Sequence, residues 1–225
     1  MLSWFPENIS TYGAQLDSLF ALIYYITGVW FVAAQALLLY FIIRFRRRPG
    51  VRASYVRGEN AGELAWVMVP VVVVLALDLF IDYRSHPAWA LVKEEFPADA
   101  IAYGGTAKQF NWAFTHPGVD GKLGSEDDVT LDNELHVPAG KDVQVSINSI
   151  DVIHSFFIPT VRVKQDVLPG RTTRVWFNAT KPGRYEIPCA ELCGFGHYTM
   201  RGFLVVHSPE EYEKWTAEQK PTPAA

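Results

Sequence analysis

The chain has 225 residues, a formal net charge of −4 and 49% hydrophobic residues. This length accommodates a membrane anchor plus one domain of ordinary size, and it excludes a catalytic subunit with many membrane spans beside that domain. The charge is unevenly distributed: from Asp82 onward there are 14 Lys and Arg against 19 Asp and Glu, a net of −5, so the part after the anchor is acidic.

The N-terminal part predicts an outer segment followed by a membrane span. Residues 1–17 are polar and aromatic, and they lack the positively charged start and short apolar run of a cleaved signal peptide. Residues 18–43 are almost entirely apolar. Because about 20 helical residues at ~1.5 Å each cross a hydrocarbon core of ~30 Å, this run predicts a spanning helix.

A basic loop separates the first apolar run from a second one at 64–81. Its six arginines are Arg44, Arg46, Arg47, Arg48, Arg52 and Arg57. Such a cluster can bind nucleic acid, but beside a membrane span it marks the cytoplasmic side, so we expect membrane lipid and no nucleic acid as a partner. The sequence therefore predicts a multi-pass protein with a transmembrane hairpin over 18–81. We expect a bacterial-type inner (cytoplasmic) membrane, with both termini on the outer, periplasmic side.

After the hairpin the sequence predicts a linker and then an all-β domain. Residues 82–100 are polar and contain two prolines, which is typical of a linker. Residues 101–207 consist of short strand-like runs separated by Gly, Pro, Asn and Asp, a pattern that indicates a β-sandwich or barrel. Alternation places Val143, Val145 and Ile147 on one face of a strand.

The C-terminal part, 208–225, predicts a short helix and a tail. Ser208 is the expected N-cap, Pro209 the first helical residue and Glu211 the partner that completes a capping box.

Two thiols, an imidazole and a thioether fall within a dozen residues, at Cys189, Cys193, His197 and Met200. A disulfide would leave the histidine and the methionine unexplained, and a zinc site would leave the methionine idle. Sulfur plus imidazole suits copper. A mononuclear blue-copper site needs only one cysteine, so two cysteines favour two copper ions bridged by both thiolates. Gly194 and Gly196 allow the tight backbone that such convergence requires.

A second histidine is needed, and His154 is the best candidate. It lies in a strand-like apolar run, where a lone histidine is more often a hydrogen-bonded core residue. The loops of a β-sandwich converge at one pole, however, as a metal site requires. We expect the other four histidines to be ordinary surface residues or residues whose ring nitrogens are hydrogen-bonded: His86, His116, His136 and His207.

The runs CAELCGFGHYTM and DVIHSFFIPTVRVKQDVLPGR, with the two-helix N-terminus, together resemble subunit II of haem–copper (cytochrome c type) oxidases. The resemblance extends from roughly Ser18 to Val206. It implies a cupredoxin-like Greek-key sandwich that carries a dinuclear copper centre, CuA. Both cysteines would bridge the ions. His154 and Met200 would complete one copper, and His197 and the backbone carbonyl of Glu191 would complete the other.

This resemblance also implies a function. A cytochrome c-type donor, soluble or docked, would give electrons to CuA, which passes them to haem in subunit I. Oxygen reduction and proton pumping would occur in that partner, so no catalytic residue is expected in this chain. Glu63, three residues before Trp66, matches a glutamate near the mouth of a proton channel, and the Glu191 side chain would reach an interfacial magnesium ion.

Two stretches depart from the family pattern. Phe110 stands where the family has a tryptophan that takes electrons from cytochrome c, and Trp112 is the alternative point where electrons enter. Residues 117–128 form a long acidic turn that loosely resembles a calcium loop but lacks the alternating oxygen ligands. We interpret this turn as a solvated acidic face that attracts a basic donor.

Two alternative functions remain. The first is the CuA subunit of a nitric oxide reductase, which only the partner's haem types and gas substrate would distinguish. The second is a membrane-anchored copper-binding or delivery protein, against which the hairpin argues because one anchor would suffice. A quinol oxidase subunit is disfavoured because that branch lacks the cysteines.

Overall fold

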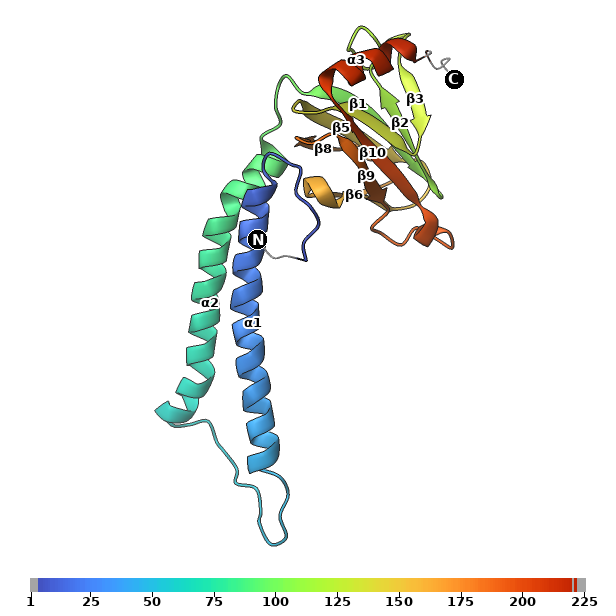
Figure 1. Cartoon of the computed structure of the whole chain (residues 1–225). Coiled ribbons are helices and arrows are strands. Elements are labelled where there is room, and N and C mark those ends of the chain that lie inside the picture. The colour runs from blue at the N-terminus through green and yellow to red at the C-terminus, as the bar shows by residue number, and fades with distance from the viewer. Residues whose placement is uncertain (1–3, 220, 222–225) are drawn as a thin grey trace. The chain divides into compact units, whose positions relative to one another are not determined.

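A computed structural model of the chain describes residues 4–219 and residue 221 (Figure 1). The described residues form two units. The first comprises residues 17–88, and the second comprises the residues before 17 together with those after 88. Of the expected 208–225 segment, residues 220 and 222–225 lie outside the described residues, as do 1–3 of the N-terminal segment.

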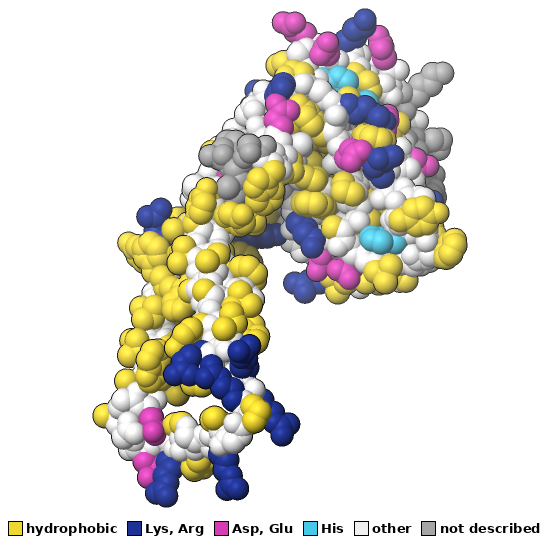
Figure 2. Space-filling view, turned by 60° about the horizontal axis from the view of Figure 1, so that its bottom comes forward, with side chains coloured by type: hydrophobic (Ala, Val, Ile, Leu, Met, Phe, Trp, Pro, Cys, Tyr) yellow, Lys and Arg dark blue, Asp and Glu magenta, His cyan; other side chains and the backbone are white. Residues whose placement is uncertain are grey.

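The first unit is a helical hairpin of α1 (Gly13–Arg44) and α2 (Ala61–Trp89). Both helices are long and apolar enough to cross a membrane. Hydrophobic side chains cover them, and the arginines gather at the loop end (Figure 2). Both helices run beyond the expected spans of 18–43 and 64–81, because hydropathy marks the thickness of the bilayer and polar residues can continue a helix outside it.

The expected linker, 82–100, is largely structured. Its first residues continue α2, and a π-helical turn, η1 (Ala90–Glu94), follows. The indole of Trp176 donates to the carbonyl of Leu91 at 2.9 Å, and Lys93 donates to Gln165 at 2.7 Å. The connection is therefore fixed to the β domain at its C-terminal end.

The second unit is a β-sandwich. One sheet has five strands in the order β3-β2-β1-β5-β8, a second has three in the order β4-β10-β9, and β6 pairs with β7. The bounds are β1 Ile101–Lys108, β2 Asn111–His116, β3 Val129–Asp132, β4 Glu134–Pro138, β5 Asp142–Ser149, β6 His154–Ile158, β7 Val163–Val167, β8 Thr173–Asn178, β9 Gly183–Pro188 and β10 Arg201–His207.

Both sheets are mixed, and their inner faces form one core. β1 pairs with β5 and β10 with β4 in parallel, whereas the other pairs are antiparallel. Val143, Val145 and Ile147 are fully buried on β5, which confirms the predicted face. The hairpin, the sandwich and the short C-terminal helix together confirm the fold class expected from the sequence.

The helix α3 (Pro209–Glu218) begins as predicted. The Ser208 side chain accepts from the N–H of Glu211, and the Glu211 carboxylate accepts from the N–H of Ser208, so the capping box is confirmed.

The N-terminal segment belongs to the core of the β unit. Ile9 and Tyr12 are buried, and Ser10 makes a β-bridge with Ala179 at the end of β8. The carbonyl of Ile9 accepts from the N–H of Thr180 at 2.7 Å. Residues 9–12 thus act as an extra edge segment of the sandwich.

Candidate metal centre

The loop that carries both cysteines connects β9 to β10; we call residues 189–200 the metal loop. Pro188 pairs with Arg201 at its base, and the N–H of Cys189 donates to the carbonyl of Met200 at 3.1 Å. Within the loop, Gly194 has a φ of 134°, which side chains rarely adopt. Short-range hydrogen bonds then close the 3-10 turn η3 (His197–Thr199), for example from the N–H of Thr199 to the carbonyl of Gly196 at 3.0 Å.

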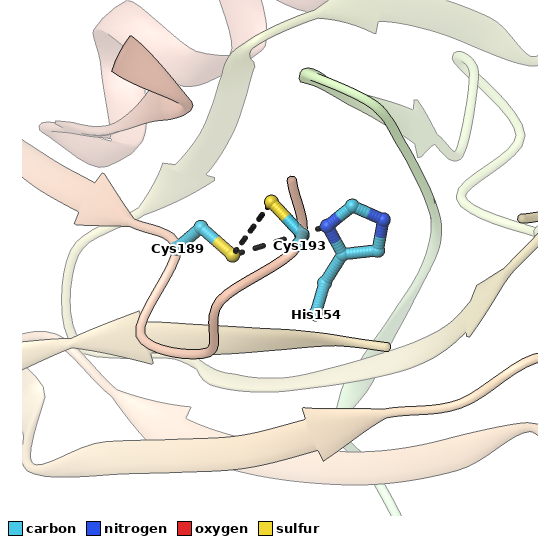
Figure 3. A group of neighbouring side chains, drawn as sticks. All are labelled: His154, Cys189 and Cys193. Atoms are coloured by element: carbon cyan, nitrogen blue, oxygen red, sulfur yellow. Dashed lines mark hydrogen bonds between the residues drawn. The ribbon is translucent and has the colours of Figure 1, made fainter. Parts of the chain in front are cut away.

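Sulfur and nitrogen donors converge in this loop. The Cys189 Sγ lies 3.9 Å from the Cys193 Sγ and 3.9 Å from the His154 Nδ1 (Figure 3). The Cys193 Sγ lies 3.6 Å from the His197 Nδ1 and 3.7 Å from the Met200 Sδ. The backbone carbonyl of Glu191 lies 3.3 Å from the Cys189 Sγ. Each of the other residues named as copper ligands thus places a donor atom within 3.9 Å of a cysteine sulfur.

The spacing of the thiols fits a shared cation. Both cysteines are free, and 3.9 Å is far beyond the ~2.05 Å of a disulfide bond. Two sulfur ligands of one tetrahedral ion, each about 2.3 Å from it, are about 3.8 Å apart. In the part of the chain that the structure describes, His154, Cys189 and Cys193 are the one group of three or more His, Cys, Asp or Glu side chains close enough to hold a metal ion.

Without a bound cation, burial disfavours the deprotonated, charged form of the cysteine thiols. Burial, and next the neighbouring Cys189, raise the pKa of the Cys193 thiol to about 11. Two thiolates at this distance repel each other, so a bound cation is what would stabilise the deprotonated pair.

Asp151 orients the histidine, a role that sequence reasoning did not assign. Its Oδ1 lies 2.9 Å from the His154 Nε2, which places the proton on Nε2 and leaves Nδ1 free as a ligand. Burial alone would raise the pKa of this carboxyl group. Hydrogen bonds from His154 and from the N–H groups of Gln109 and Val152 outweigh that effect and lower it to about 2. The sequence feature that could have indicated this role is a carboxylate three residues before the candidate ligand His154.

The turn between β1 and β2 contacts the metal loop directly. The Gln109 side chain donates to the carbonyl of Cys193 at 2.6 Å, and the peptide bond to Phe110 is cis. The Phe110 ring lies against the loop backbone: a Cβ added to Gly196 would be 2.6 Å from the ring. Phe110 is 37% exposed, and three apolar side chains of the metal loop are more exposed still: Leu192, Phe195 and Tyr198.

Trp112 lies on the inner side of the site. It is fully buried, and its ring is 5.9 Å from that of His154 and 5.8 Å from that of Phe156. A docked protein can therefore touch Phe110 but cannot touch Trp112.

Glu63 lies in the hairpin unit and is engaged at the start of α2. Its carboxylate accepts from the N–H groups of Gly58 and Glu59, at 2.6 and 3.2 Å, and its own N–H donates to the side chain of Asn60. This is a helix-capping arrangement.

The acidic turn lies at the opposite end of the sandwich from the metal loop. β2 starts beside Phe110 and ends at His116. The residues that follow, 117–119 and Gly121, line a cleft with Tyr212 and Thr216 of α3. At ~3.3 Å per residue the turn is roughly 20 Å from Phe110. Three of its carboxylates, those of Asp120, Asp127 and Asp128, accept hydrogen bonds from N–H groups of the turn; Asp128, for example, accepts from the N–H of Gly124 at 2.8 Å. The turn thus lies beyond the Debye length of about 8–10 Å from Phe110, so we expect its charge to contribute little to docking at the metal loop, and the attraction expected from the sequence stays a prediction.

Three of the remaining histidines form a cluster under α3. His116 is fully buried and satisfied: its Nδ1 faces the carbonyl of Val129, and its Nε2 accepts from the N–H of His136. His136 lies 2.8 Å from His207 and stacks on Trp215 with centroids 4.3 Å apart. They are satisfied residues, as expected, but they are also neighbours of one another, which the sequence did not indicate.

Comparison with known proteins adds to this geometry. The family described as the periplasmic domain of cytochrome c oxidase subunit II matches residues 105–208. The alternative cytochrome c oxidase subunit 2 of Bradyrhizobium diazoefficiens is 32% identical, over 96% of this chain and 84% of its own length. Cytochrome c oxidase subunit 2 of Thermostichus vulcanus is 31% identical, over 96% of this chain and 78% of its own. The crystal structure of the periplasmic domain of subunit II (CoxB) of Bradyrhizobium japonicum is similar with a TM-score of 0.49 and 29% identity, covering 55% of this chain and 95% of that one.

Proposed function

Because the chain belongs to the cytochrome c oxidase subunit II family, we propose that it is the subunit through which electrons enter a haem–copper oxidase, and that it holds a dinuclear CuA centre. The observation that carries this proposal is that two free, buried thiols lie within 3.6–3.9 Å of two imidazoles and a thioether. A zinc site of Cys and His would leave the thioether without a role.

The ligands proposed are His154, Cys189, Cys193, His197 and Met200, with the backbone carbonyl of Glu191. Bound there, the copper pair supplies a one-electron redox centre between a cytochrome c-type donor and the haem of the catalytic subunit. The chain contributes a fixed geometry. The loop base holds the thiols at their spacing, Asp151 holds the His154 ring, and the core side chains keep water away from the ligands. Because Met200 is a weak ligand, its role is to adjust the potential.

The exposed apolar side chains around the metal loop indicate where the electron donor docks. Phe195 is 95% exposed, and Leu192 and Tyr198 are nearly as open, next to the half-exposed ring of Phe110. Such a patch on an outer domain fits a partner surface. We place the contact with the donor at Phe110. Trp112 supports His154 from the inside.

Topology follows from the N-terminal segment. The β unit includes residues 9–12 as well as the residues after 88, so both ends of the hairpin connect directly to that unit. The arginine loop then faces the cytoplasm, in agreement with the positive-inside rule. The protein is membrane-anchored with a periplasmic domain. The catalytic subunit is its partner, with the Glu191 side chain directed to a magnesium ion at their interface and Glu63 at the mouth of a proton channel.

The test is copper loading of the full chain in detergent. We expect two copper ions per chain and an EPR spectrum of one electron shared by both. Cys189→Ser and Cys193→Ser should each abolish that spectrum, because each would remove one of the two thiolates that would hold the copper pair. Met200→Leu should retain both ions and shift the potential.

Matched controls make the result specific. Met68→Leu lies in α2, outside the site, and should change nothing. For the ligand variant His154→Asn, the matched control is His86→Asn, which lies in α2. A spectrum of one localised copper ion, or stoichiometric zinc with no preference for copper, would reject the proposal.

A further inference from the structure

We propose that Gln109 is a positioning residue that holds the metal loop in its binding geometry before any metal arrives. The inference rests on the proposed copper site, but it concerns hydrogen bonds of the chain itself and is testable on the metal-free protein.

Gln109 joins the parts of the chain that supply the ligands. Its side-chain Nε2 donates to the carbonyl of Cys193 at 2.6 Å, and its backbone N–H donates to Oδ2 of Asp151 at 2.6 Å. The other oxygen of Asp151 lies 2.9 Å from the Nε2 of His154. A single residue thus connects the thiol loop to the histidine that lies at the start of β6. No bound ion is needed to complete this chain of hydrogen bonds.

The platform that carries Gln109 is rigid. Lys108 pairs with Asn111 at the β1–β2 turn, and β1 lies between β2 and β5 in the five-stranded sheet. The metal loop, by contrast, has a ladder only at its base, and two of its residues are glycines. Sites are positioned best when regular elements support the flexible segments that carry ligands. The turn supplies that support.

The metal loop is shaped around this side chain. A Cβ added to Gly194 would lie 2.6 Å from the Gln109 Nε2 and 3.3 Å from the Phe110 ring. Only glycine lets the backbone approach so closely, and its φ of 134° also favours glycine. The close approach brings the carbonyl of Cys193 within reach of the amide and so fixes the direction of the adjacent thiol.

The experiment uses the full chain in detergent with Gln109→Met, which keeps the side-chain length and removes the N–H donor. The backbone bond to Asp151 remains, so only the link to Cys193 is lost. Hydrogen exchange of the metal-free protein should be about tenfold faster or more in peptides covering residues 190–198. Copper affinity, measured by competition with a chelator, should fall about 10–100-fold, as is usual for partners of metal ligands.

Two further variants separate positioning from general stability. Gln109→Glu has the shape of the native side chain without the amide donor, and it should reproduce both losses even where Gln109→Met folds poorly. Gln144→Met makes the same substitution on β5, away from the site, and should leave exchange and affinity unchanged.

The proposal is overturned if both Gln109 variants keep wild-type exchange in the metal loop and copper affinity within twofold. It is also overturned if Gln144→Met causes equal losses, because the effect would then be global. The exchange measurement needs no copper. A wild-type chain that bound no copper pair would therefore reject the proposed function while leaving the role of Gln109 to be decided by exchange alone.

Discussion

Replacing Gly196 with alanine should push the Phe110 ring off the metal loop. The new Cβ would lie 2.6 Å from Cδ2 of the ring and 2.8 Å from two other ring atoms. Because carbon atoms in contact prefer about 3.5–4.0 Å, the ring must move by roughly 1 Å. Overpacking of this kind costs about 1–3 kcal/mol. The backbone itself accepts alanine, since Gly196 has a φ of −88°.

The sign of the effect should reverse when the ring is absent. In a Phe110→Ala background the clash disappears, and Gly196→Ala should be neutral or stabilise the loop by about 0.4–1 kcal/mol, because alanine restricts the unfolded chain. The four proteins form a double-mutant cycle with an expected coupling of about 1–4 kcal/mol.

Hydrogen exchange in the metal-free full chain is the assay. The N–H of Thr199 donates to the carbonyl of Gly196 at 3.0 Å, and that of Met200 donates to His197 at 3.1 Å, so both report opening of this turn. At 1.4 kcal/mol per tenfold, Gly196→Ala should accelerate their exchange about 5- to 150-fold in the wild-type background only. An equal acceleration in both backgrounds would show that the clash is not with Phe110.

The remaining predictions concern pH, charge and topology. Burial lowers the pKa of His116 to about 4. The unfolded chain binds this proton with a pKa of about 6.5, so up to about 3 kcal/mol of stability is present above pH 6.5 and lost as the pH falls toward 4; His116→Gln should flatten that dependence in melts of the metal-free protein. Asp127→Asn combined with Asp128→Asn should change the stopped-flow rate of reduction by a basic cytochrome c less than twofold, and a steep loss would restore the acidic turn as the docking face. Single cysteines placed between Arg44 and Arg57 in a Cys189→Ser, Cys193→Ser background should resist impermeant thiol reagents in intact cells, and labelling there would invert the proposed orientation.

The sequence was sufficient for features that depend on short-range patterns. The two apolar runs, the alternation in β5 and the capping box of α3 each lie within one continuous stretch of sequence, and each was found where predicted. The ends of α1 and α2 were not predictable from hydropathy, because Gly13 and Trp89 lie in polar sequence that remains helical.

The candidate site shows the same difference between local sequence patterns, which could be predicted, and long-range contacts, which could not. Cys189, Cys193 and His197 lie in one motif and could be named together. The roles of Asp151 and Gln109 depend on three loops that are far apart in the sequence and meet only through the register of the sandwich. The position of the acidic turn was hidden for the same reason, since its composition was evident but its distance from the metal loop was not.

The N-terminal segment has a consequence for biosynthesis. Ile9 and Tyr12 complete the core of a domain whose remaining residues are synthesised only after both helices. In the topology proposed above, these residues must cross the membrane before that domain can finish folding. The strands leave the ribosome after both helices, so the metal loop gains its complete scaffold only once the first dozen residues have crossed the membrane and the last strand, β10, has been synthesised. Insertion of the hairpin and maturation of the copper site are thereby ordered in time.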